Sequence, residues 1–398
     1  MMWMGIDTHL KTHEVEIQNN EGKNMWSGRI DNDRKGFEYL LEKMRTVENA
    51  NSQKIGGIFM NPTGNYHMPV KHFLESNGFV VYTVDARRTH HLRMTQNLGR
   101  EKSDPEDASV LASTARKDEH ALDSKGHNTL RESGLTRLLE QLKSSSILLT
   151  NLIISDLAAV FPEYVDMFSV DAKISLNLLK SYPTPDLINN ATEEELYKLM
   201  DTGKGHYTRE DAVKLKEAAK DTVGIPDPDG IHAYRIIMNA ERLESEKNRM
   251  KRIESEIARR FSKNSDIERI AEIKGVSRLA ASAIVSEIGN IDQFSSPEKL
   301  QAYGGKAPNI YGSGGKTQST RSSRIRNPHL SNTIYECAVS LVLHRNAEFI
   351  EIYDREINKG KKSTQAYIVV GKRLIHHIYS MMKNGKPYRC RIPNRNNG

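Results

Sequence analysis

The chain has 398 residues, which predicts two or three domains. Its 58 Lys and Arg exceed its 51 Asp and Glu, and the net charge of +7 fits an anionic partner such as nucleic acid about as well as a basic protein without one. Two distant cysteines, Cys337 and Cys390, argue against a disulfide scaffold and a Cys-ligated zinc site, and fit a reducing cytosol. No leader is recognised, and the longest apolar run, residues 147–154, is too short to cross a bilayer, so no membrane partner is expected.

The first hundred residues alternate between strand and helix patterns. Apolar runs and turn residues predict these elements in order: strands over 2–8, 13–18 and 25–30, a helix capped by Asn32 and running to about residue 47, a strand over 55–60, a helix over 66–76 and a strand over 79–84. This order, followed by further helix, is that of a ribonuclease-H-like α/β sheet. A fold of this kind does not by itself define a function.

Asp7 ends the first strand. A buried carboxylate costs free energy unless it is paired, so either a basic partner or a bound cation is expected. Asp104 and Asp107 stand at the start of a helix that opens with Pro105, which makes Asp104 a candidate N-cap and places both carboxylates on one side. Such a pair either caps the helix or binds a hard divalent cation through oxygen.

Two long helical patterns occupy the middle of the chain, over residues 133–160 and 231–261. Large apolar residues recur there at seven-residue intervals, namely Leu135, Leu142 and Leu149, and then Ile236, Leu243, Met250 and Ile257. This spacing predicts either a coiled coil, within or between chains, or two core helices of a bundle. A smaller helical block, residues 171–223, lies between them.

The C-terminal third begins with a helix, a turn at Gly275 and a second helix up to Ile288. This is either a helix-hairpin-helix, whose turn amides hold a phosphate, or a plain helical corner. Residues 302–316 then carry five glycines and predict a mobile or tightly turned loop. Ser313 lies between glycines, so it is either an exposed nucleophile or a linker serine.

A basic strip follows this serine. Serines and threonines are interleaved with four cations, which are Lys316, Arg321, Arg324 and Arg326. Such a pattern favours contact with phosphates. Helices are expected over residues 330–342 and 364–382, followed by a basic tail that frays.

Four motifs, in order along nearly the whole chain, resemble the DEDD-type transposases of the insertion-sequence-110 family, which includes bridge-RNA-guided recombinases and Piv-type DNA invertases. The family patterns are Gly-Ile-Asp-x-x-Lys, Glu-Pro-Thr-Gly-x-Tyr, Lys-x-Asp-x-x-Asp-Ala, and Tyr-x-Gly-x-x-Pro followed by Ser-Gly. The matching positions are 5–11 (one residue longer than the pattern), 61–66, 102–108, and Tyr303, Gly305, Pro308, Ser313 and Gly314.

The resemblance implies an α/β plus α architecture in four parts. These are a RuvC-like, ribonuclease-H-fold DEDD domain over 1–130, coiled-coil helices with a helical insertion over 131–262, a mostly helical serine-bearing domain over 263–385 and a basic tail over 386–398. It also implies that Mg²⁺ or Mn²⁺ is held by Asp7, Asn61, Asp104 and Asp107 while Ser313 attacks a DNA phosphodiester. Nucleic-acid contacts are expected from Lys102, Lys316, Arg321, Arg324 and Arg326.

The partners implied by the resemblance are DNA, a structured guide RNA and further copies of the chain in a dimer or tetramer. The implied location is the cytoplasm of a bacterium or archaeon, in association with the nucleoid. Because base pairing with the RNA would select the DNA, the protein need read only shape and backbone.

This sequence departs from the family pattern at Asn61, where the family has Glu. Three interpretations stay open: a deliberately inactivated variant, a natural weakened relative that still binds, or a site that tolerates Asn. Hard cations prefer anionic oxygen, which favours the first two. A second departure is residues 327–330, Asn-Pro-His-Leu, where the family has Gly-Asn-x-x-Leu. The rival functions are a non-catalytic RNA- or DNA-binding protein and a metal-dependent junction nuclease in which water attacks.

Overall fold

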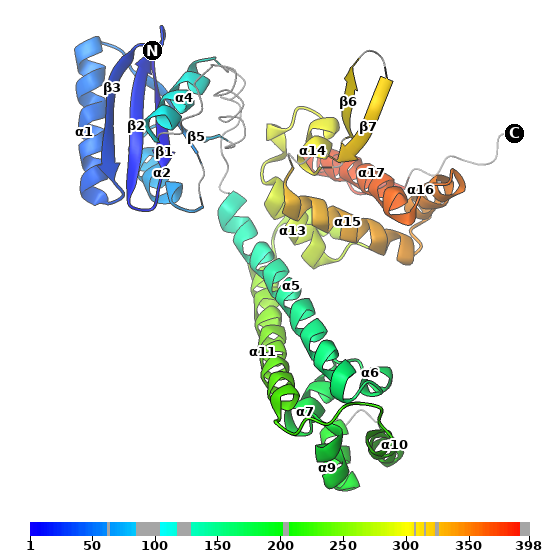
Figure 1. The fold of residues 1–398 in the computed structure, drawn as a ribbon. Coiled ribbons are helices and arrows are strands. Elements are labelled where there is room, and N and C mark those ends of the chain that lie inside the picture. The colour runs from blue at the N-terminus through cyan, green and yellow to red at the C-terminus, as the bar shows by residue number, and fades with distance from the viewer. Residues whose placement is uncertain are drawn as a thin grey trace, which may run out of the picture. The chain divides into compact units, whose positions relative to one another are not determined.

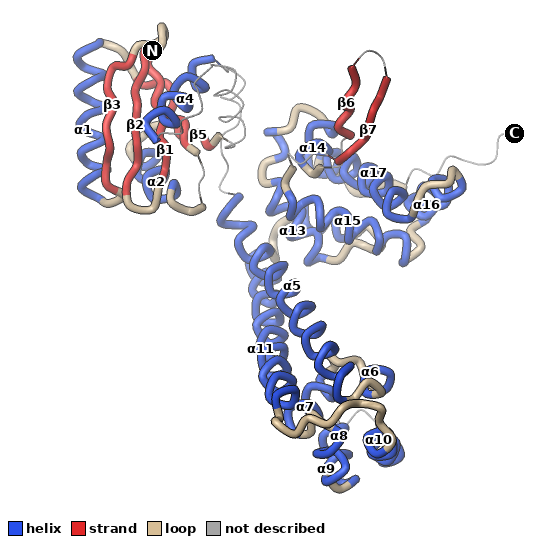
Figure 2. Tube along the Cα trace, viewed as in Figure 1, coloured by secondary structure: helices blue, strands red, loops and turns tan. Residues whose placement is uncertain are grey.

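The computed structural model describes residues 1–61, 64–84, 104–117, 129–201, 207–305, 308–313, 316–322 and 326–390. The chain divides into two compact units, the first formed by residues 1–128 with 290–295, and the second by residues 129–289 and 296–398. Figure 1 labels the elements of each unit, and Figure 2 distinguishes helices from strands. The finer division into four parts stays a prediction.

A five-stranded mixed sheet forms the centre of the first unit, as far as the structure describes it. Its strands lie in the order β3-β2-β1-β4-β5, and their bounds are β1 Met2–Thr8, β2 Thr12–Asn19, β3 Asn24–Asp31, β4 Ile55–Met60 and β5 Val81–Thr83. The first three strands form an antiparallel meander, whereas β4 and β5 run parallel to β1. The order of strands and helices predicted from the sequence is confirmed.

Helices cover both faces of this sheet (Figure 1). Helices α1 (Arg34–Asn51) and α2 (His67–Ser76) pack on one face, where the buried core includes Met4, Ile6, Leu40, Ile58 and Leu74. Helix α4 (Asp104–Lys117) packs on the other face, where Phe59, Leu111 and Ala115 are buried. Strand β1 therefore lies between two apolar layers, which explains its nearly continuous apolar sequence.

Two local predictions in this unit were wrong. Helix α1 begins at Arg34 and is capped by Asp33, whose side chain accepts a hydrogen bond of 2.7 Å from the Gly36 amide. Asn32 instead donates from its side chain to the Leu10 carbonyl. Strand β5 spans three residues rather than the six expected.

The second unit begins with two long helices, α5 (Thr129–Val160) and α11 (Ile231–Arg260). They run antiparallel, because Ser146 contacts Met250 while Asp156, ten residues later on α5, contacts His232 (Figure 1). Their shared core includes Leu149, Ile153 and Leu157 of α5 and Ile236, Ala240 and Leu243 of α11. Of the residues at seven-residue intervals, Leu149, Ile236 and Leu243 are buried in this core, whereas Leu135 and Leu142 are only half-buried.

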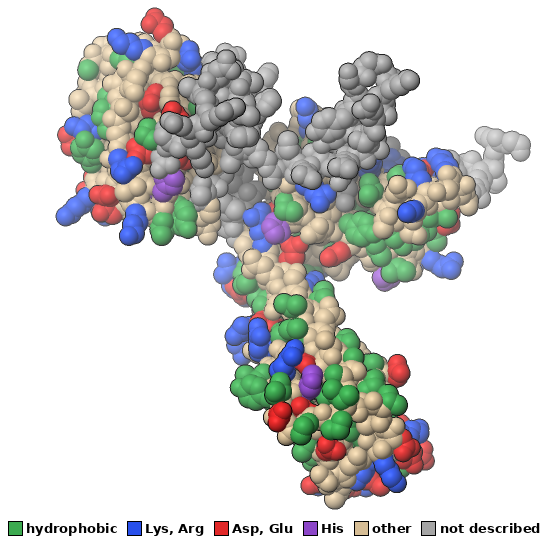
Figure 3. Space-filling view, in the orientation of Figure 1, with side chains coloured by type: hydrophobic (Ala, Val, Ile, Leu, Met, Phe, Trp, Pro, Cys, Tyr) green, Lys and Arg blue, Asp and Glu red, His purple; other side chains and the backbone are tan. Residues whose placement is uncertain are grey.

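Residues 133–160 of α5 are long and apolar enough to cross a membrane by length and composition. In the structure 33% of its apolar window is buried, and the buried residues Leu149, Ile153 and Leu157 belong to the core shared with α11. Its outer side exposes Ile147 and Leu148, and Figure 3 shows such apolar side chains mixed with charged ones over the helix pair.

Further helices, from 4 to 22 residues long, and a β-hairpin form the rest of the second unit in the part that the structure describes. Between the two long helices lie α6 Tyr164–Met167, α7 Lys173–Ser181, α8 Pro185–Asn190, α9 Glu193–Met200 and α10 Arg209–Lys220. After them come α12 Ser265–Ala271, α13 Arg278–Ile288, α14 Pro297–Tyr303, β6 Pro308–Ser313, β7 Lys316–Ser322, α15 Pro328–Leu343, α16 Ala347–Asn358 and α17 Ser363–Asn384. A 3₁₀ turn, Ile291–Gln293, belongs to the first unit.

Candidate active site

Asp7 and Asn61 come together at one edge of the sheet. Strands β1 and β4 are parallel neighbours in which Ile6 is opposite Met60, so the next residue of each strand emerges at the same edge. The Asn61 amide donates to the Ile6 carbonyl at 3.4 Å, and the Thr8 hydroxyl donates to the Asn61 carbonyl at 2.7 Å. The backbone at this edge is thus fixed on both strands.

Helix α4 runs antiparallel to β1, and it begins at the edge where Asp7 lies. Ser109 bonds to Glu16 and Gln18, and farther along α4, Arg116 bonds to the carbonyl of Asn20. Glu16 and Gln18 of β2 are opposite Gly5 and Trp3 of β1, and Asn20 directly follows β2. Later residues of α4 therefore contact the sheet nearer to the start of β1. The start of α4 therefore points toward the C-terminal end of β1.

The close packing of α4 on β1 depends on Gly5. A Cβ atom at Gly5 would lie 2.0 Å from the carbonyl oxygen of Ala108 and 2.5 Å from the amide nitrogen of Ala112. Asp104 precedes Ala108 by four residues, about 6 Å along a helix, and Asp7 follows Gly5 by two residues, about 7 Å along a strand. Along the strand direction, the backbone of Asp104 is therefore at about the same level as the backbone of Asp7.

The acidic pair at the start of α4 is described only in part. The helix begins at Asp104 itself, so the expected cap position falls within the helix, and the side chain of Asp104 lies outside the described residues. Asp107 is half-buried one turn later.

Asp7 is 4% exposed and has a hydrogen-bonded neighbour, His9, whose Nε2 lies 3.1 Å from its carboxylate. The amide of His9 donates to Nδ1 of His13. Burial lowers the pKa of His13, so this ring is neutral near pH 7 and accepts that bond. His9, two residues away, is thus one partner of this strand-end carboxylate.

The side chains at this edge of the sheet are of the chemical type that binds a cation. The side-chain oxygen of Asn61 is buried and has no hydrogen-bond partner among the described residues. Asp7 and the acidic residues at the start of α4 likewise carry only oxygen donors, the kind of ligand that a hard divalent cation prefers. Among the described residues, no three His, Cys, Asp or Glu side chains are grouped to hold a metal ion.

Ser313 is the last residue of β6 and is paired with Lys316 of β7, so two glycines connect the strands of this antiparallel hairpin. The window predicted as a mobile or tightly turned loop thus contains strand β6, whose pairing with β7 shifts register between Tyr311 and Gly312. The hairpin is described by its backbone, which places Lys316 and Arg321 on β7. Lys102 and Arg324 lie outside the described residues.

The turn predicted as a helix-hairpin-helix connects α12 to α13 through Gly275, which has a φ of +103°. A Cβ atom there would lie 2.9 Å from Cα of Leu341 on α15. The side chain of Asn346 also donates to the Lys274 carbonyl at 3.0 Å. One side of this turn is therefore covered by the end of α15 and by Asn346, which follows it.

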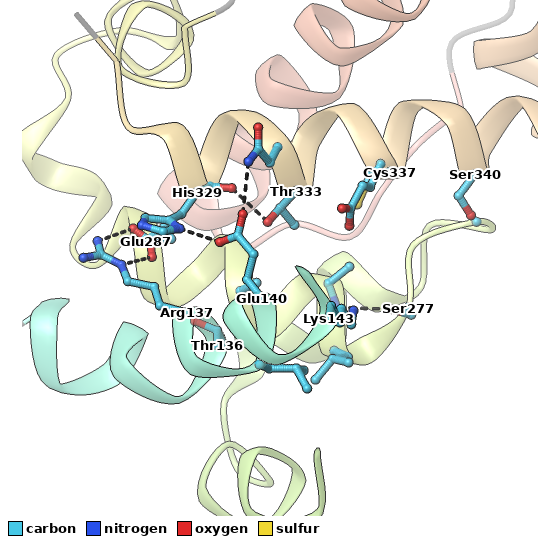
Figure 4. Close-up of a pocket in the computed structure, with 17 residues that line it drawn as sticks. Thr136, Arg137, Glu140, Lys143, Ser277, Glu287, His329, Thr333, Cys337 and Ser340 are labelled. Carbon is cyan, nitrogen blue, oxygen red and sulfur yellow. Dashed lines mark hydrogen bonds and ion pairs between the residues drawn. The ribbon is translucent and has the colours of Figure 1, made fainter. Parts of the chain in front are cut away.

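A polar cluster between α5, α13 and α15, which no sequence motif indicates, borders a cavity of about 200 Å³ (Figure 4). Arg137 forms two hydrogen bonds to the buried carboxylate of Glu287, and Glu140 pairs with His329. A signal in the sequence is Glu287 itself, the single charged residue in the last nine residues of α13.

Comparisons with known proteins identify the family. Residues 4–162 match a family model described as a transposase, of the DEDD IS110 type, and residues 267–354 match the transposase IS116/IS110/IS902 family. The chain is 22% identical over 387 residues to the uncharacterized 44.8 kDa protein of insertion element IS116 from Streptomyces clavuligerus. The aligned region covers 96% of this chain and 95% of that protein. It is 20% identical over 393 residues to the uncharacterized 42 kDa protein of IS900 from Mycobacterium paratuberculosis, which covers 97% of both. The chain therefore belongs to the IS110 family of transposases.

Proposed function

We propose that this transposase cuts and rejoins DNA with Ser313 as the nucleophile and with a divalent cation held at the edge shared by Asp7, Asn61, Asp104 and Asp107. Family membership already implies DNA binding and recombination. The observation that carries the finer proposal is the close approach of α4 to Gly5, which brings the acidic start of that helix level with Asp7. The strand order supports a ribonuclease-H-like, RuvC-like domain, in which such an edge holds Mg²⁺ or Mn²⁺.

In the proposed reaction the Ser313 hydroxyl oxygen forms a bond to phosphorus, and one bond from phosphorus to a deoxyribose oxygen breaks. The serine proton passes to solvent, and the released sugar oxygen takes up a proton. When bound, the cation neutralises charge on the phosphate and on the leaving oxygen. The number of phosphodiester bonds stays constant, so the reverse step rejoins a strand without ATP.

The chain's own residues have the remaining roles in this proposal. Asp7 and the α4 carboxylates supply negative charge, and the Asn61 oxygen supplies a neutral ligand. Lys102, Lys316, Arg321, Arg324 and Arg326 neutralise DNA phosphates. Asp7 and Ser313 belong to different compact units, so a complete site requires one unit of each kind, from one chain or from two chains of a dimer or tetramer.

A structured RNA encoded beside the element is the proposed guide. A net charge of +7 over the chain suits contact with nucleic-acid backbone, and base pairing would supply the sequence specificity. Binding of the transcript from the flank of the encoding element, compared with a scrambled RNA of equal length, tests this part. Equal affinity and equal salt dependence for both RNAs would contradict it.

Asn61 favours a second candidate, a protein that binds RNA or DNA on this fold without cutting. A neutral oxygen in place of a carboxylate weakens cation binding. In the first candidate, Asn61→Glu raises the yield of a covalent protein–DNA adduct in Mg²⁺, while Asp7→Asn and Ser313→Ala abolish the adduct. If binding is salt-sensitive and neither wild type nor Asn61→Glu cleaves DNA, the second candidate is correct. Cleavage that survives Ser313→Ala without an adduct would instead indicate attack by water.

A further inference from the structure

The two ends of the β6–β7 hairpin are joined to each other. The chain leaves α14 at Tyr303 and returns at Asn327, and the Asn327 amide donates to the Tyr303 carbonyl at 2.8 Å. The side chain of Asn327 also donates to the Tyr303 hydroxyl at 2.8 Å. At Gly305, with a φ of +67°, a Cβ atom would lie 2.3 Å from Cδ of Arg326, so the ends also approach closely there. The base of the hairpin is therefore closed.

Glu287 of α13 lies at the centre of this closure. Its carboxylate accepts a 2.7 Å hydrogen bond from the side chain of Asn327, and its backbone carbonyl accepts a 3.4 Å bond from the Tyr303 hydroxyl. The same carboxylate accepts two bonds from Arg137, from Nε at 2.6 Å and from Nη2 at 2.8 Å. Glu287 is 2% exposed, so loss of any of these partners leaves part of a buried charge unsatisfied.

Arg137 connects the base of the hairpin to the long helix α5. Glu140, one turn later on the same helix, accepts a 3.0 Å bond from Asn332 and pairs with His329 in the first turns of α15. Figure 4 shows Arg137 and Glu140 projecting from α5 toward Glu287 and His329. Helix α5 is thus bonded both to the helix that carries Glu287 and to the helix that follows the hairpin.

We propose that Glu287 is a positioning residue for the Ser313 hairpin and that Arg137, Tyr303 and Asn327 complete a clamp that couples the hairpin base to α5. The inference rests on the proposed function, in which Ser313 is the nucleophile. It assigns a physical role to Tyr303, a motif residue without a role in the chemistry. Displacement of α5 at Arg137 then changes the backbone order of the hairpin through the carboxylate of Glu287.

The test measures backbone hydrogen exchange of residues 308–322 in the full-length chain, without DNA or RNA. Asn327→Asp keeps the oxygen that caps α15 at the Leu330 amide but places a second carboxylate against Glu287. Tyr303→Phe removes only the hydroxyl. Each is expected to speed exchange of the hairpin amides about tenfold or more, while α13 and α15 keep most of their protection.

Two matched controls separate positioning from general loss of stability. Asn264 caps α12 as Asn327 caps α15, so Asn264→Asp makes the same chemical change away from the clamp. Lys143→Ala changes a residue of α5 that lines the same cavity as Arg137. Arg137→Ala is expected to loosen the hairpin, and both controls to leave its exchange within about twofold of wild type. Equal loosening by the controls, or unchanged hairpin exchange in Asn327→Asp and Arg137→Ala, would overturn the clamp.

A second readout joins the clamp to the proposed reaction. With Mg²⁺, cognate DNA and the flanking transcript, Tyr303→Phe is expected to slow Ser313-dependent adduct formation at least tenfold with DNA affinity unchanged. Unchanged adduct formation in a variant with a loosened hairpin would refute the positioning role. Adduct that persists in Ser313→Ala would refute the proposed function instead, while the exchange measurement still decides whether the clamp exists.

Discussion

Replacing Gly5 by alanine is expected to disrupt the first unit at the edge where Asp7 lies. The added Cβ would be 2.0 Å from the Ala108 carbonyl oxygen, whereas a carbon–oxygen contact is comfortable at about 3.3 Å. Helix α4 would therefore have to move by more than about 1 Å, because both obstructing atoms belong to its backbone. Overpacking of this size costs about 3 kcal/mol of unfolding free energy.

Urea unfolding of Gly5→Ala, followed by circular dichroism, measures this cost. Gly134→Ala is the matched control, because Gly134 lies in α5 and, beyond its own stretch of helix, no described atom lies within 4 Å of its added Cβ. That control is expected to gain about 0.5–1 kcal/mol, the usual effect of alanine for glycine within a helix. If Gly5→Ala unfolds at the wild-type urea concentration, the close packing of α4 on β1 is wrong.

Three further predictions concern capping and pH. Asp33→Ala is expected to cost about 1 kcal/mol in urea unfolding, more than Asn32→Ala, because Asp33 caps α1. Burial lowers the pKa of His13 below its ordinary 6.5, so near and below that pH the unfolded chain takes up a proton that the folded chain does not. The free energy of unfolding should therefore fall as the pH drops below 6.5, by up to about 1.4 kcal/mol per pH unit. Replacing His13 by Phe should flatten this slope. Burial acts to raise the pKa of Glu140, but hydrogen bonds from His329 and Asn332 outweigh it and lower the pKa below its ordinary 4.5. The stabilisation by Glu140 is therefore complete above pH 4.5 and is lost as the pH falls below it. Replacing Glu140 by Gln should remove this loss from unfolding curves measured in acid.

Much of the first unit could be predicted because its signals are local. Strands β1 and β4 are continuous apolar runs bounded by polar residues, and the structure gives both of them the predicted bounds. The cap of α1 could not be assigned reliably, since Asn32 and Asp33 are adjacent and equally suitable cap residues. Their roles are decided by backbone angles and by the Leu10 carbonyl, which is distant in sequence.

The candidate site could be predicted only as a set of residues. The periodicity places Asp7 at a strand end and Asp107 near a helix start, but no sequence pattern states that α4 packs antiparallel on β1. That arrangement depends on Gly5, whose missing side chain admits the helix backbone. The clamp was missed for a related reason: Arg137, Glu287 and Asn327 lie 150 and 40 residues apart in sequence and meet only through helix packing.

The central claim is that Ser313 attacks DNA at a site that needs the carboxylates. Its most direct test is to trap the protein–DNA adduct of the Asn61→Glu variant in Mg²⁺, digest the DNA and the protein, and sequence the modified peptide by mass spectrometry. Trypsin releases residues 307–316, which contain one serine, Ser313, and one tyrosine, Tyr311. A phosphodeoxynucleotide remnant on Ser313, absent when Asp7 is replaced by Asn, is the predicted result. A remnant on Tyr311, or on any other peptide, would contradict the claim.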